Sequence, residues 1–171
     1  MRHPAACGGW LSALGAARAA GNLRLMQPRI AGDCVYWVES RPAENGRGVL
    51  VRKRTGESRR DLTPPSFSVR SRAHEYGGGA YAISSDRVFF VNDSDQQIYR
   101  LPAAGGAPHQ LTTARNCRFA DLLPDERRRR LVCVCENHTE ESAQPVNSLV
   151  SVAPFRIVHA NLYICEPRVI L

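Results

Sequence analysis

Several features that mark common protein classes are scarce or missing in this chain of 171 residues. It has no run of about 20 apolar residues, which a membrane-spanning helix needs. Its six cysteines include no Cys-x-x-Cys pair, which argues against a zinc ribbon or a thioredoxin-like site. Cys133, Cys135 and His138 lie close together in the sequence but lack a fourth ligand at a standard spacing. We therefore expect no metal, no cofactor and no contact with a membrane.

Lysine is nearly absent, because Lys53 is the only lysine among 23 basic residues. The formal net charge is +7, which by itself would suit an anionic partner. The arginine run 127–130 follows an acidic turn, however, and the aromatic residues lie mainly in apolar segments and not between basic residues. We expect no nucleic-acid partner, whereas an acidic peptide or an acidic partner domain remains compatible with this charge.

The N-terminus resembles a secretion signal only superficially. Arg2 and His3 precede a mildly apolar stretch, 4–20, that glycine, serine and arginine residues interrupt. We expect a short helix at 12–20 instead of a signal peptide, and a cytoplasmic protein with reduced thiols.

What the chain does contain is an internal repeat with a period of about 50 residues. Segment 33–40 (Asp-Cys-Val-Tyr-Trp-Val-Glu-Ser) matches segment 86–93 (Asp-Arg-Val-Phe-Phe-Val-Asn-Asp), and Asp61-Leu-Thr63 is echoed by Gln110-Leu-Thr112. A period of this size, built from short apolar strands and turn residues, is typical of the four-stranded blades of a β-propeller.

The repeat predicts an all-β fold, a partial β-propeller of about three four-stranded antiparallel blades. We expect an N-terminal segment at 1–22 and blades at about 23–64, 68–113 and 118–171, the last part being irregular. The predicted strands are 35–38, 49–52 and 60–63 in the first blade, 79–83, 88–91, 97–101 and 109–112 in the second, and 119–123, 130–135, 148–152 and 167–171 in the third.

Strands 35–38 and 88–91 are apolar on both faces, which suits sheets that lie between neighbouring sheets. Three blades are fewer than the roughly four to eight that close a propeller. We therefore expect two uncapped terminal faces, with self-association through them, and we interpret the chain as a fragment of a longer protein.

Four motifs in a fixed order carry a family resemblance. They are Gly9-Trp10-Leu-Ser12, Tyr36-Trp-Val-Glu-Ser-Arg-Pro42, Gly46-Arg-Gly-Val-Leu-Val-Arg52 and His74-Glu-Tyr-Gly-Gly-Gly-Ala-Tyr81. From about residue 9 to about residue 152 the chain resembles the N-terminal propeller of bacterial prolyl oligopeptidase-family serine peptidases, in the acylaminoacyl-peptidase and dipeptidyl-peptidase-like branch. Segment 153–164 departs from this pattern.

The resemblance implies a propeller that gates the access of peptides to a C-terminal α/β-hydrolase domain with a Ser-Asp-His triad. This sequence lacks the Gly-x-Ser-x-Gly elbow that such a domain needs, and its nearest approach is Gly56-Glu-Ser-Arg-Arg60. We assign no catalytic residue and expect the chain to be inactive alone. The alternatives are a non-catalytic interaction module and an inactive truncated remnant.

The candidate binding site is the segment before strand 79–83, which would open at the mouth of the propeller channel. There Glu75 would hold a peptide's ammonium group, His74 or Tyr76 would hydrogen-bond the peptide backbone, and Arg72 would pair with a carboxylate. The alternative is structural, with His74, Glu75 and Tyr76 fastening one blade to the next.

Overall fold

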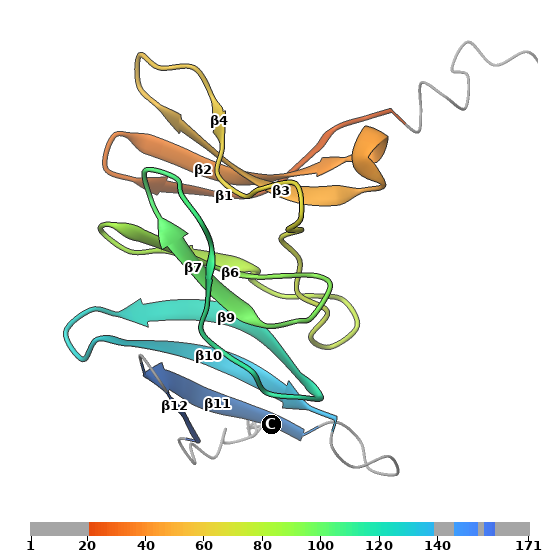
Figure 1. Cartoon of the computed structure of the whole chain (residues 1–171), viewed down its shortest axis with the longest axis vertical. Coiled ribbons are helices and arrows are strands. Elements are labelled where there is room, and N and C mark those ends of the chain that lie inside the picture. Colours follow the sequence, from red (N-terminus) through yellow and green to blue (C-terminus); the bar gives the residue numbers. More distant parts are fainter. Residues whose placement is uncertain (1–20, 139–145, 154–155, 160–171) are drawn as a thin grey trace, which may run out of the picture.

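The computed structural model describes residues 21–138, 146–153 and 156–159, and these residues form three four-stranded antiparallel sheets (Figure 1). In each sheet the strand order follows the sequence, which is the topology of a propeller blade. The predicted all-β partial propeller is confirmed. The first blade holds β1 (Arg24–Ala31), β2 (Cys34–Arg41), β3 (Arg47–Arg54) and β4 (Arg60–Asp61); the second holds β5 (Tyr81–Ile83), β6 (Arg87–Val91), β7 (Ile98–Pro102) and β8 (His109–Gln110); the third holds β9 (Cys117–Asp125), β10 (Arg130–Asn137), β11 (Val146–Ala153) and β12 (Arg156–His159).

Helical structure within the described ranges is limited to one 3-10 turn, η1 (Pro42–Glu44), in the β2–β3 hairpin. The helix expected at 12–20 lies outside these ranges. Accordingly, the described part of the chain has no helix long and apolar enough to cross a membrane.

Strand β1 was missed by the sequence prediction. Its pairing with β2 shifts register between Met26 and Arg29, and Gln27 at this bulge has a φ of 52°. A bulge breaks the alternation of apolar and polar residues, and Pro28 within it is a residue that usually interrupts strands.

The fourth strand of the third blade is β12, and not the predicted strand 167–171, which lies outside the described residues. β12 pairs with β11 after a connection of two residues, 154–155. A strand that can fold back through a short hairpin pairs locally in preference to a more distant segment.

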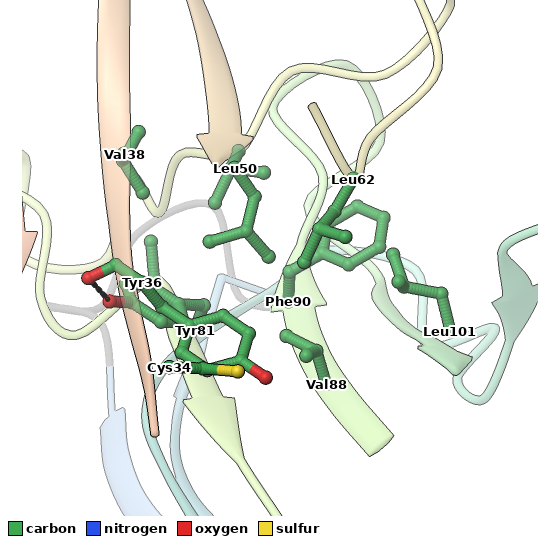
Figure 2. Packing of buried hydrophobic residues seen from close by; sticks show 11 residues of the cluster. Cys34, Tyr36, Val38, Leu50, Leu62, Tyr81, Val88, Phe90 and Leu101 are labelled. Carbon is green, nitrogen blue, oxygen red and sulfur yellow. Dashed lines mark hydrogen bonds between the residues drawn. The ribbon is translucent and has the colours of Figure 1, made fainter. Parts of the chain in front are cut away.

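The core is divided into two clusters, one on each side of the second blade. Val88 and Phe90 of β6 pack in the cluster shared with the first blade, whereas Val91 packs, with half-buried Phe89, in the cluster shared with the third. Figure 2 shows the first cluster, in which the Tyr81 hydroxyl donates to the carbonyl oxygen of Tyr36 at 3.1 Å. The expectation that strand 88–91 lies between two neighbouring sheets is confirmed.

The two terminal faces of the stack expose apolar side chains. On the first blade, Leu25, Ile30 and Val35 lie on the face turned away from the second blade, and Ile30 is 78% exposed. On the third blade, Leu123 is exposed on the corresponding outer face, beside half-buried Val132. Nothing among the described residues covers these side chains.

Candidate functional site

The predicted site lies on a tight loop immediately before β5. His74 and Glu75 are consecutive non-glycine residues with left-handed backbone, at φ values of 55° and 61°. Each left-handed residue costs about 1 to 2 kcal/mol relative to ordinary backbone. The turn is closed by a hydrogen bond from the Gly77 N–H to the Ala73 carbonyl at 2.9 Å. Such strained conformations persist only where the surroundings hold them, and they concentrate at functional sites.

The loop is fastened to the second and third blades by hydrogen bonds. The Ser71 hydroxyl donates to the Phe119 carbonyl at 2.7 Å, and the Arg72 N–H donates to the Gln96 side chain at 2.8 Å. The His74 N–H donates to the Glu136 carboxylate at 3.1 Å. These bonds hold the main chain of the loop and leave the tip free to face solvent.

Glycines after the loop allow the second and third blades to approach each other closely. A Cβ added at Gly78 would lie 2.7 Å from the Ala120 Cβ, and one added at Gly79 would lie 2.9 Å from the Asp121 carboxylate. A side chain at Gly78 would therefore push β9 away from β5, whereas one at Gly79 would first displace the Asp121 carboxylate.

Two bulge residues on neighbouring blades clamp this glycine segment. From β1, the Gln27 side chain accepts from the Ala80 N–H at 3.0 Å and donates to the Gly78 carbonyl at 3.2 Å. From β9, the Asp121 carboxylate accepts from the Gly79 N–H at 2.7 Å. Gln27 and Asp121 both have left-handed backbone, which turns their side chains toward β5. The first strands of the first and third blades are thus tied to the segment between the end of the loop and β5.

The four predicted site residues have different surroundings. Arg72 is paired with Asp93 at 2.8 Å, so its guanidinium already has a carboxylate partner. Glu75 pairs with Arg118 of β9 at 2.5 Å, although its carboxylate remains largely exposed. Tyr76 is 97% exposed, an unusual position for a large aromatic side chain. His74 is also exposed.

Sequence reasoning missed the group that underlies this loop, Glu136 of β10, which is only 4% exposed. Burial opposes its ionisation, but contacts with His138, the His74 N–H and Arg118 outweigh burial and hold the pKa of Glu136 below its usual range. Nε2 of His138 lies 2.9 Å from the carboxylate without the alignment of a hydrogen bond. The only hint of Glu136 in the sequence is that an acidic residue follows the apolar residues of this strand.

The site therefore combines a fixed frame with an exposed tip. Glu136 and Arg118 form the frame, and Glu75 and Tyr76 project from it. This arrangement offers a carboxylate for a cation and a phenol for a hydrogen bond or a stacking contact. Among the described residues, no cluster of three His, Cys, Asp or Glu side chains is arranged to hold a metal ion.

Solved structures similar to this chain include peptidases that hydrolyse puromycin. A Mycobacterium tuberculosis puromycin-hydrolyzing peptidase has 33% sequence identity and a TM-score of 0.72, over 84% of this chain and 24% of that chain. A puromycin hydrolase has 30% identity and a TM-score of 0.74, over 84% of this chain and 24% of that chain. A mutant puromycin hydrolase complexed with PGG has 27% identity and a TM-score of 0.77, over 88% of this chain and 26% of that chain.

The chain thus spans about a quarter of the length of these relatives. No protein-family model matches the sequence, and no curated protein matches it.

Proposed function

We propose that this chain, which corresponds to the N-terminal propeller region of a prolyl oligopeptidase-family peptidase, gates the access of peptides to a hydrolase domain outside this sequence. The observation that carries the proposal is the strained loop before β5, whose tip presents Glu75 and Tyr76 to solvent. The substrates are peptides or peptide-like amines, in keeping with the puromycin that the similar enzymes hydrolyse.

Glu75 is the residue that recognises a free N-terminus. Its carboxylate is exposed, so a peptide ammonium can reach it without displacing a buried group. Arg118 is the less exposed partner of the pair and fixes the direction of the carboxylate. The adjacent phenol of Tyr76 meets the first peptide group, because a large exposed aromatic residue provides contact area at little entropic cost.

Peptide binding to the full chain tests this role. A tripeptide with a free N-terminus and a fluorophore at its C-terminus is compared with its N-acetyl analogue by fluorescence anisotropy. Glu75→Gln should weaken binding of the free peptide about tenfold, because a hydrogen bond to a charged group contributes about 1.5 to 3 kcal/mol and about 1.4 kcal/mol is a factor of ten. The acetylated peptide should bind equally to both proteins.

The matched control is Glu57→Gln, which neutralises an exposed glutamate in the turn between β3 and β4, away from the loop. It should bind both peptides as the unchanged chain does. Equal loss in Glu57→Gln and Glu75→Gln, or no loss in Glu75→Gln, would contradict the gate assignment.

A second candidate function is that of an interaction module completed by self-association. Exposed Leu25, Ile30 and Val35 on one terminal face favour it, because the outer faces of terminal repeats are normally polar. Light scattering after size exclusion should then give a defined oligomer that Ile30→Glu converts to a monomer. A monomer before and after the substitution would exclude this role.

A further inference from the structure

We propose that the groove between the second and third blades binds a small organic anion with an apolar body and a carboxylate head. The groove has a volume of about 750 Å³ and lies beside the β5–β6 and β9–β10 hairpins. Its lining begins at Ser84, after β5, whereas the loop with Glu75 precedes β5. It is therefore a site separate from the proposed gate, and its volume is within the range of roughly 300 to 1,000 Å³ typical of small-molecule sites.

Two cross-strand rows of side chains line the groove. On the second blade, Phe89 is paired with Arg100, and Arg100 is paired with His109. On the third blade, Leu131 is paired with Val152. Directly paired residues of antiparallel strands share a face of the sheet, and half-buried Phe89 packs against the cluster that contains Leu131 and Val152. Phe89, Leu131 and Val152 thus give the groove an apolar part, and Arg100 and His109 add two basic side chains from the second blade.

The carboxylates around the groove already have partners. Asp125 accepts from Arg130 at 3.0 Å and from Arg128 at 3.3 Å. Glu126 accepts from the Ser84 hydroxyl at 2.6 Å and from the Ser85 N–H at 2.9 Å, which joins the two hairpins.

The remaining carboxylate is equally engaged, since Asp86 pairs with Arg87 at 3.2 Å. By contrast, Arg100 is half-buried and has no acceptor for its guanidinium anywhere in the described ranges. The lining therefore has an excess of positive charge, with five arginines against three carboxylates, and Arg100 is the half-buried guanidinium among them that lacks an acceptor within the described part of the chain.

A guanidinium in this position favours a planar anion. It presents its N–H donors in a fork that matches both oxygens of a carboxylate, and a partly buried donor without an acceptor is costly. Nδ1 of His109 lies 2.8 Å from the Gln110 carbonyl oxygen, which leaves Nε2 available for a further contact. Phe89, Leu131 and Val152 would cover the apolar body of the ligand.

Isothermal titration of the full chain with sodium octanoate and with octan-1-ol tests the proposal. Octanoate should bind, and octanol should bind at least tenfold more weakly because it lacks the charge. Arg100→Gln should weaken octanoate binding at least tenfold. Arg100→Lys keeps the charge but loses the forked geometry, so a loss of at least threefold is expected in this variant even if Arg100→Gln proves unstable.

The matched control is Arg115→Gln, which removes an exposed arginine outside the groove, and it should bind octanoate as the unchanged chain does. Octanoate binding that is undetectable, matched by octanol, or unchanged in both Arg100 variants would overturn the proposal. None of these results bears on the peptide gate, because Glu75 is not part of the groove.

Discussion

Phe90→Ala should strongly destabilise the junction between the first two blades. Phe90 is 0% exposed, and its ring lies 5.8 Å from Phe67 in an edge contact and 5.7 Å from Tyr99 in a stacked contact. Truncation of a buried phenylalanine to alanine costs about 3 to 5 kcal/mol, and each lost aromatic pair is worth about 0.5 to 1.5 kcal/mol of favourable interaction. The partial overlap of these contributions gives an expected loss of about 4 kcal/mol.

Urea unfolding measures this loss. With a slope of about 2 kcal/mol per molar urea, the midpoint should fall by about 2 M. The control is Ile30→Ala, which shortens a largely exposed side chain on the terminal face and should change the free energy of unfolding by less than about 0.5 kcal/mol. A loss below 1 kcal/mol for Phe90→Ala, or equal losses for the two variants, would refute the claim that burial between blades stabilises the stack.

Two further predictions use the same unfolding assay. Gly78→Ala should cost about 1 to 3 kcal/mol, because its Cβ would lie 2.7 Å from the Ala120 Cβ; a change below 0.5 kcal/mol would contradict the close approach of β5 and β9. Burial raises the pKa of Tyr81 to about 12, so this group ionises first in the unfolded chain, and Tyr81 by itself should lower the free energy of unfolding by up to about 2.7 kcal/mol between about pH 10 and pH 12. Tyr81→Phe should remove this contribution and leave those of Tyr99 and Cys133, whose pKa values burial also raises to about 12; an identical pH profile would contradict the assignment to Tyr81.

The fold was predictable where local pattern and burial agree. Strand β6 is apolar on both faces because each face packs against another blade. The burial of this strand can therefore be predicted from its residues alone. β1 was not predictable in this way, because it is the bulged first strand of a terminal blade and most of its side chains are exposed. The edge of the third blade was misassigned because β12 is short and was read as part of an irregular insertion.

The residues of the loop could be predicted from the sequence, but their partners on the third blade could not. The run His74-Glu75-Tyr76 followed by glycines indicated a special loop, and the structure has left-handed backbone there. The partners Arg118 and Glu136 come from 43 and 62 residues further along the chain, and only the packing of the third blade against the second brings them to the loop. Single-sequence patterns contain no information on such pairings, because they depend on which blade faces meet.

Long-range contacts from the first and third blades hold the loop and the segment that follows it. Gln27 of the first blade and Asp121 of the third hold the segment that follows the loop, and Arg118 of the third blade holds Glu75 itself. All three blades are therefore needed to fix the direction of the Glu75 carboxylate, and all three are present. The direction of Glu75 is thus set by contacts within this chain, while the channel that it would guard requires further blades to close. It follows that recognition of a peptide's N-terminus and exclusion by size are separable properties, and only the first is encoded in the contacts described.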